Sequence, residues 1–336
     1  RPLEATPAAI RHVKDRYAAR KLPLTPARRR LARIPRGATL IENPSGTAPG
    51  FWIERPRSRI CFLPGVPSEC RPMFLASVLP ETEKIFPLRR VHTAFWRTFG
   101  WGESRLYQEI APLVARLEKK YPHTFRFGVH ISFPCIDLSL EVLERGKRPS
   151  QKEIAALTAH IDKTTEQILV TRERKSIPEV VFDLLRNNRL TLSAAESCTG
   201  GLLGKTLTDF PGSSHAFVGG VVSYANSAKQ QLLGVQKQTL ENHGAVSQSA
   251  VEEMAQGIRQ RLGTDYAIAL SGISGPGGGT PDKPVGTIYV AILGPRRSKT
   301  LHQVILNGQG SRDQNRVIAM NLALDALRLM ILDDLG

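Results

Sequence analysis

From residue 177 onward, short apolar runs alternate with segments of helical periodicity, and this alternation limits the possible folds more than any other feature. Strands and helices that alternate along a chain favour a parallel sheet covered by helices. We therefore predict a three-layer α/β domain with a mostly parallel sheet over residues 177–336. Its expected strands span residues 190–195, 216–223, 266–271, 286–293 and 300–305. Its expected helices span residues 178–187, 200–208, 226–233, 249–262 and about 314–332, with Ser249 and Glu252 as a capping box.

The chain before residue 177 divides into two smaller predicted domains. Residues 88–170 indicate a small α+β layer with strands at 91–99, 124–133 and 137–143, and helices at 103–119 and from 150. The last helix is expected to run on to a polar linker at residues 171–176. Residues 1–87 indicate the final part of an α/β domain, with a helix at 4–20, a loop-rich stretch at 38–51 and a strand at 60–63. The segment Pro64-Gly65-Val66-Pro67 follows that strand, and its two prolines and one glycine predict a sharp turn of the chain.

The composition excludes several classes of protein. A chain of 336 residues, 41% of them hydrophobic, can bury the cores of two or three domains. No window approaches the ~18 consecutive apolar residues of a membrane-spanning helix. The four cysteines form no C-x-x-C pair and the eight histidines show no metal-binding spacing, so we expect a cytoplasmic protein without a structural metal. The chain opens on Arg1-Pro2 rather than on methionine, which suggests a fragment or a processed product.

The positive charge of the chain is concentrated in its first half. Residues 176–336 hold 14 Lys and Arg against 13 Asp and Glu, so nearly all of the +16 formal charge lies in residues 1–175. The basic cluster at residues 28–36 could attract the phosphate groups of a nucleotide or of a polynucleotide. A solvated basic face is the favoured interpretation, because charge runs are common and no base-reading motif accompanies this one. Nucleic acid is therefore not the expected partner.

The run Ala195-Glu196-Ser197-Cys198-Thr199-Gly200-Gly201 lies where an expected strand ends and an expected helix begins. The hydroxyl of Ser197 would face the carboxyl edge of the sheet, beside unpaired helix N–H groups that could hold an oxyanion or an anionic ligand. The alternative is that Ser197 or Thr199 only caps the helix. Two successive glycines favour the first interpretation, because they cost helix stability and permit close approach to the backbone.

A serine hydroxyl needs a base to become a nucleophile, and no Ser-His-Asp set with the spacing of a known family is present. The candidate base is Lys229, in the run Tyr224-Ala225-Asn226-Ser227-Ala228-Lys229. This role requires that burial or a neighbouring cation lowers the lysine pKa from about 10.4. Tyr224 could hydrogen-bond to either residue or to the leaving group. The alternatives are an exposed helix lysine and a packed aromatic ring.

A third segment, from Gly272 to Gly279, is rich in glycine and is followed by Lys283. It offers consecutive backbone N–H groups and a cation, which suit a phosphate or a carboxylate. Alone, it would also fit a flexible turn. Together, the three segments indicate covalent hydrolysis of a phosphorylated small molecule.

These segments resemble the C-terminal nicotinamide mononucleotide deamidase domain of the CinA family, the competence-damage-inducible proteins. The resemblance continues through Leu233-Gly234-Val235, His243-Gly244-Ala245-Val246-Ser247 and Lys283-Pro284-Val285-Gly286. It implies hydrolysis of the carboxamide of nicotinamide mononucleotide to nicotinate mononucleotide and ammonia, without a metal or other cofactor. It also implies that Ser197 is the nucleophile and that Lys229 and Tyr224 assist it. The candidate substrate-binding residues are Thr199, Gly200, Gly201, Asn226, Gly275, Gly277, Gly278, Lys283 and Arg312.

The same resemblance extends over the rest of the chain. Residues 88–170 are similar to the KH-type domain of the family, although they lack a G-x-x-G clamp for nucleic acid. Residues 1–87 are similar to the latter part of its molybdopterin-binding-like domain, through Gly46-Thr47-Ala48-Pro49-Gly50-Phe51 and Leu63-Pro64-Gly65-Val66-Pro67. The family's nucleotide pyrophosphatase uses a phosphate segment that would precede Arg1. We therefore expect ADP-ribose cleavage, with a divalent metal, only from an intact N-terminal domain.

Other readings of the sequence stay open. Cys198 could be the nucleophile, because thiols are intrinsically more reactive than hydroxyls. The chain could also be a basic nucleic-acid-binding module with a silent C-terminal domain, and its DNA affinity would then fall steeply with salt. The family resemblance and the long apolar C-terminal helix favour a homodimer.

Overall fold

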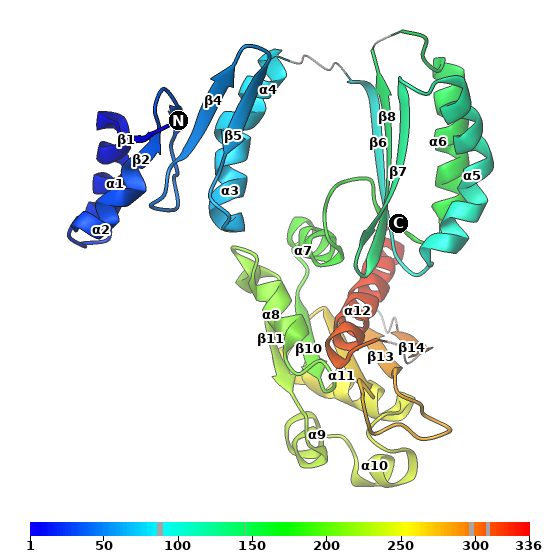
Figure 1. The fold of residues 1–336 in the computed structure, drawn as a ribbon. Helices are drawn as coiled ribbons and strands as arrows, with labels where there is room; N and C mark the ends of the chain where they lie inside the picture. Colours follow the sequence, from blue (N-terminus) through cyan, green and yellow to red (C-terminus); the bar gives the residue numbers. More distant parts are fainter. Residues whose placement is uncertain (86–89, 145, 296–298, 307–309) are drawn as a thin grey trace. The chain divides into compact units, whose positions relative to one another are not determined.

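The computed structural model describes residues 1–85, 90–144, 146–295, 299–306 and 310–336. It divides the chain into two compact units, Arg1–Arg89 and Arg90–Gly336. Figure 1 shows the helices and strands of each unit. The fold belongs to the α/β class, as predicted, and its strands form several separate sheets. No helix in the described ranges has the length and apolar character needed to cross a bilayer.

The first unit consists of short antiparallel strands and helices. The expected N-terminal helix is present but starts at Pro7 rather than at residue 4, because residues 3–5 pair with residues 33–35 as a strand and Thr6 caps the helix by accepting the N–H of Ala9. The stretch expected to be loop-rich is instead partly strand, since residues 39–41 and 50–55 pair with each other. The strands are β1 (Leu3–Ala5), β2 (Arg33–Pro35), β3 (Thr39–Ile41), β4 (Gly50–Arg55) and β5 (Ser58–Phe62). The α-helices are α1 (Pro7–Ala19), α2 (Pro26–Arg29), α3 (Pro67–Met73) and α4 (Leu79–Ile85).

The second unit begins with an antiparallel sheet of four strands, in the order β7-β8-β6-β9. The strands are β6 (Arg90–Thr98), β7 (Phe125–Ser132), β8 (Cys135–Leu143) and β9 (Leu169–Thr171). Two helices, α5 (Glu103–Lys120) and α6 (Gln151–Thr165), cover one face of this sheet and bury Trp96, Leu138 and Leu140 (Figure 1). The expectation that the last helix runs on to the linker is wrong. Helix α6 ends at Thr165 because the apolar residues after it pair with the edge of β6 as β9.

The remaining residues form a five-stranded sheet in the order β11-β10-β12-β13-β14. The strands are β10 (Leu192–Glu196), β11 (Phe217–Val222), β12 (Tyr266–Gly272), β13 (Thr287–Leu293) and β14 (Lys299–Ile305). β10 is parallel to both β11 and β12, but β12, β13 and β14 pair antiparallel. The prediction of a mostly parallel sheet is therefore wrong for the second half of this sheet. The reason is that no helix separates β12 from β13, and a parallel crossover requires one.

Helices cover both faces of this sheet. One layer holds α7 (Ile177–Asn187), α8 (Leu202–Thr208) and α12 (Arg312–Leu335). The other holds α9 (Asn226–Leu233), α10 (Lys237–His243) and α11 (Gln248–Leu262). Strand β12 alternates between the layers, because Ile268 and Leu270 pack toward α12 while Ala267 and Ala269 pack toward α11.

On the α11 side of the sheet, the start of α11 and the presence of α10 differ from the sequence prediction. The cap of α11 is Ser247, whose hydroxyl accepts the N–H of Ala250, so the predicted capping box of Ser249 and Glu252 is wrong. Ser249 already lies inside the first helical turn, and the Glu252 carboxylate pairs with Lys299. Helix α10 was not expected from the sequence.

Candidate active site

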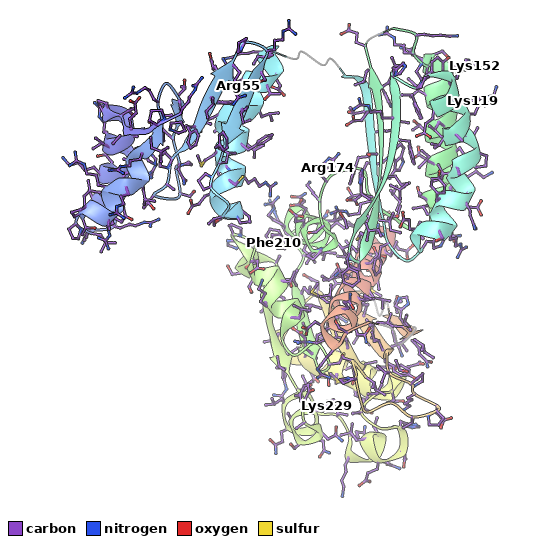
Figure 2. All side chains as sticks on the ribbon, in the orientation of Figure 1. Arg55, Lys119, Lys152, Arg174, Phe210 and Lys229 are labelled. Carbon is purple, nitrogen blue, oxygen red and sulfur yellow. The ribbon has the colours of Figure 1, made fainter. Side chains whose placement is uncertain are left out.

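Ser197 and Lys229 meet at the carboxyl end of strand β10. Ser197 is the first residue after β10, and its N–H donates to the carbonyl of Leu270, 3.1 Å away, on the neighbouring β12. Lys229 lies on α9, and its Nζ is 3.1 Å from the Oγ of Ser197. Both side chains are buried, with 8% of Ser197 and 1% of Lys229 exposed. Figure 2 labels Lys229 in this part of the molecule.

The surroundings of Lys229 favour its neutral form. Nζ lies 2.7 Å from the carbonyl oxygen of Ser223 and 3.4 Å from that of Tyr224. Carbonyl dipoles provide much less compensation for a buried ammonium than a carboxylate would. Burial accordingly lowers the pKa of Lys229 below 10.5, against a smaller opposing effect of Cys198. The lysine therefore meets a requirement of a general base, because its pKa is lowered from the ordinary value.

The neighbouring Cys198 is a poor candidate nucleophile. Burial raises the pKa of its thiol to about 11, although Ser274 and the N–H groups of Cys198 and Thr199 hydrogen-bond toward the sulfur. A thiol with this pKa is protonated at neutral pH, and only the thiolate is a strong nucleophile. The environment thus favours Ser197 over Cys198.

The side chain of Glu196 binds the N–H groups at the start of helix α8, which were expected to be unpaired. Its buried carboxylate accepts the N–H groups of Gly201, Leu203 and Gly204, at 3.0, 3.0 and 2.8 Å. The N–H of Gly200 donates to the carbonyl of Ser197 at 3.2 Å. These N–H groups were expected to bind an oxyanion or a ligand. In the structure they donate instead to the carboxylate of Glu196 and to the carbonyl of Ser197. Sequence reasoning missed this role, and the signal was a glutamate directly before the serine.

Tyr224 and Arg312 form a pair at the mouth of the site. Arg312 donates through Nη2 to the hydroxyl of Tyr224 at 2.8 Å and through Nη1 to the carbonyl of Gly275 at 2.7 Å. The tyrosine side chain is 61% exposed. Its hydroxyl was expected to bind Ser197, Lys229 or the leaving group, and in the structure it binds Arg312 instead.

The first turn of α12 connects two loops of the site. Asn315 donates to the carbonyl of Ser274 at 3.0 Å, next to the contact of Arg312 with Gly275. Arg316 donates through Nε to the carbonyl of Thr199 at 3.1 Å. Sequence reasoning identified Arg312 but missed Asn315 and Arg316, because their partners lie far away in the chain.

These elements enclose a pocket of about 280 Å³, which we call the Ser197 pocket. It is small, near the lower limit of about 300 Å³ for ligand sites. It is lined by Ser197, Cys198, Tyr224, Lys229, Ala245, Val246, Ser271, Gly272, Ile273, Ser274, Gly275, Gly277, Gly278 and Arg312.

The glycines of the pocket allow close backbone packing that a side chain would prevent. Gly275 has a φ of +84°, and a Cβ there would lie 2.7 Å from Val285. Within the described residues, the N–H groups of Gly277 and Gly278 have no acceptor. They remain available for an anionic group of a ligand.

Five predicted binding residues lie outside the lining of this pocket. Three of them have backbone groups that are already engaged. Arg316 donates to the carbonyl of Thr199, Gly200 donates to the carbonyl of Ser197, and Gly201 donates to the carboxylate of Glu196. Asn226 is exposed at the start of α9. Lys283 donates to the carbonyl of His243 at 2.8 Å. Ala245 and Val246, which do line the pocket, had been noted only as part of the family resemblance.

Among the described residues, no group of His, Cys, Asp and Glu side chains could hold a metal ion.

Comparison with known proteins gives one consistent family. Residues 174–331 match the CinA C-terminal domain. The CinA-like protein of Parasynechococcus marenigrum (strain WH8102) is 40% identical over 98% of this chain and 78% of its own length. The nicotinamide-nucleotide amidohydrolase PncC of Shewanella oneidensis is 39% identical over 90% of this chain and 69% of its own length. A solved structure, competence/damage inducible protein CihA from Agrobacterium tumefaciens, shares 35% identity over 46% of this chain and 92% of that chain, with a TM-score of 0.44.

Proposed function

The chain belongs to the CinA family, and from this premise we propose that it is an amidohydrolase that converts nicotinamide mononucleotide to nicotinate mononucleotide and ammonia. The observation that carries the proposal is the 3.1 Å separation between Nζ of Lys229 and Oγ of Ser197. A buried lysine with a lowered pKa can act as a general base, and a serine activated by such a base can attack an amide.

The proposed reaction proceeds by acyl transfer. Ser197 Oγ attacks the carboxamide carbon while neutral Lys229 accepts the hydroxyl proton. Lys229 then returns this proton to the departing nitrogen, the C–N bond breaks and ammonia leaves an acyl ester on Ser197. Water attacks the ester with Lys229 again as base, which releases the carboxylate and restores the serine hydroxyl. The N–H groups of Gly200 and of the start of α8 are engaged within the chain, so we assign the oxyanion to the N–H of Cys198, the residue after the nucleophile, which in the free protein faces its own sulfur.

The phosphate of the substrate is assigned to the other end of the Ser197 pocket. Arg312 supplies a fixed positive charge there, and Gly277 and Gly278 supply free N–H donors. A guanidinium and backbone N–H groups are the donors that phosphate oxygens prefer. The substrate would thus span from Arg312 to Ser197, with its carboxamide at the nucleophile.

Ammonia release from nicotinamide mononucleotide tests the proposal, with Ser197→Ala and Cys198→Ala as the paired variants. We expect Ser197→Ala to abolish release and Cys198→Ala to retain most of it, because the thiol is protonated and buried. Loss of activity only in Cys198→Ala would make the cysteine the nucleophile. No release from the folded, unaltered chain would remove the proposed activity.

The family membership also supports three wider proposals. These are a KH-type domain at residues 88–170, part of a molybdopterin-binding-like domain at residues 1–87, and a homodimer. Each stays a prediction. ADP-ribose cleavage is not part of this proposal, since the resemblance implies it only for an intact N-terminal domain.

A further inference from the structure

The four-stranded sheet of the second unit, in the order β7-β8-β6-β9, has a pocket at the edge of strand β6. β6 pairs with β9 only at Arg97 and Thr98. Within the described part of the chain, the preceding residues of β6, from 92 to 96, therefore have a strand neighbour on one side only. The chain leaves the sheet after Thr171, and the space between it and β6 is a pocket of about 460 Å³. We call this the β6 pocket.

Two arginines stand on the outer wall of the β6 pocket. Arg172 and Arg174 follow β9 directly, and both line the pocket. Arg174 lies over the ring of Phe95, 4.8 Å from its centroid, and Figure 2 labels it beside the sheet. Arg172 lies 4.7 Å from the ring centroid of Trp96 and pairs with Asp162 at the surface. The aromatic contacts hold both guanidinium groups next to the open edge.

Two buried polar atoms on the inner wall have no hydrogen-bond partner among the residues that the structure describes. Nε2 of His92 and Oγ1 of Thr158 are inaccessible to solvent and make no hydrogen bond within the described residues, and both residues line the β6 pocket. Buried polar atoms are nearly always paired, so each unpaired one requires an explanation. An edge strand adds further unpaired backbone N–H groups. The pocket thus combines cations with unused hydrogen-bonding groups.

We propose that the β6 pocket binds a small molecule that carries a phosphate group. Two guanidinium groups and the strand N–H groups are donors suited to phosphate oxygens, and the His92 ring and Thr158 hydroxyl, closed to solvent in the free protein, would turn toward the ligand when it binds. Glu141 is the one carboxylate among the lining residues that the structure describes, and Asp162, outside the lining, pairs with Arg172, so Arg174 is the main cation offered to a ligand. Its volume suits a compact ligand of mononucleotide size rather than a polymer. None of its lining residues belongs to the Ser197 pocket, so the site is independent of the proposed amidase.

Titration calorimetry with inorganic phosphate tests this site in the full chain. The background carries Arg312→Ala, which removes the phosphate-binding cation of the Ser197 pocket. In this background we expect phosphate to bind, and Arg174→Ala to weaken its affinity at least tenfold. Arg116→Ala is the matched control, because Arg116 is exposed on α5 outside the β6 pocket and its loss changes the net charge equally.

Thr158→Val gives a second readout that a purely structural role would not produce. Removing a hydroxyl that is unpaired in the free protein should raise the melting temperature of the ligand-free chain while it weakens phosphate binding. Absence of phosphate binding in the Arg312→Ala background would overturn the proposal. So would equal weakening by Arg116→Ala, which would indicate only the general positive charge. Tighter, Arg174-dependent binding of a single-stranded oligonucleotide than of phosphate would instead identify a polynucleotide site.

Discussion

At the scale of single residues, the burial of Lys229 on α9 lowers its pKa and so makes it a candidate base for Ser197. Sequence patterns identified Ser197 and Lys229 but left open whether the lysine is exposed. That question depends on how α9 packs, since burial is what lowers the pKa of Lys229. The role of Glu196 was not predictable for a similar reason, because its three hydrogen-bonding partners become neighbours only when α8 forms.

Replacing Lys229 by methionine tests the base directly. Met fills the space of the lysine stem without a titratable group, so we expect kcat/KM to fall by roughly 10²–10⁴ with the fold retained. In the unaltered chain, only neutral Lys229 is active, so kcat/KM should rise with pH as the lysine loses its proton. Because burial lowers this pKa, the rise should be centred below 10.5.

The measurement for Lys229 is a pH profile of ammonia release. Lys205→Met, which removes an exposed lysine on α8, is the control and should leave the profile unchanged. A profile that falls with rising pH over the same range would contradict the role of Lys229 as a base.

Arg312 should affect binding more than chemistry. Arg312→Ala removes the cation at the phosphate end of the Ser197 pocket, so we expect KM to rise more than kcat falls. Tyr224→Phe, which removes an acceptor of Arg312 but not its charge, should act in the same direction and more weakly. Steady-state kinetics of both variants separate these effects. An unchanged KM in Arg312→Ala would exclude this residue from substrate binding.

At the scale of helices and strands, local patterns predicted most elements and failed where pairing is non-local. Helices with clear caps, such as α1 and α7, were predictable because Thr6 and Ser176 precede a proline near the helix start. β9 and the antiparallel half of the large sheet were not, because a strand's direction and partner depend on residues far along the chain.

The cap of α8 should connect stability with activity. Glu196→Ala leaves three N–H groups without their carboxylate, and we expect the free energy of unfolding to fall by about 2 kcal/mol. Activity should fall as well, because Ser197 is the next residue. Glu179→Ala is the matched control, since it removes a capping glutamate of α7 that lies outside the Ser197 pocket.

Urea unfolding and ammonia release measure the two effects of Glu196→Ala. The control should lose stability without losing kcat beyond the loss of folded protein. A kcat unchanged in Glu196→Ala would show that α8 does not position Ser197.

The contact between α9 and α11 should control the position of Lys229. A Cβ at Gly257 on α11 would lie 1.9 Å from the carbonyl oxygen of Leu233, the last residue of α9. Gly257→Ala should therefore displace α9 and lower both stability and kcat. Gly219→Ala is the control, because its Cβ would make only an ordinary contact, 3.6 Å from Leu262. Equal kcat values for the two variants would contradict this account.

At the scale of the whole molecule, the two compact units have separate cores. The buried clusters around Val13 and Met73 belong to the first unit, and those around Trp96, Ile268 and Met254 to the second. All residues of the Ser197 pocket lie in the second unit. The positive charge does not follow the boundary between the units. The excess of Lys and Arg extends over residues 1–175 and therefore lies in both units.

A chain shortened to residues 90–336 should therefore retain the proposed amidase. We expect kcat/KM within about twofold of that of the full chain, because no residue of the pocket or of its three supporting cores is removed. Ammonia release and circular dichroism of the shortened chain provide the measurement. A folded but inactive shortened chain would mean that the first unit contributes to the site.

The contacts of α12 also set the order in which the site can assemble during synthesis. Arg312 comes 88 residues after Tyr224, and Asn315 and Arg316 come later still. A ribosome thus produces the nucleophile and its base long before the residues that connect their loops. Helix α12 also supplies much of the apolar layer on one face of the sheet, so a chain without it would lack both a packed site and the cation that selects a substrate, and we expect amidase activity only after α12 has packed.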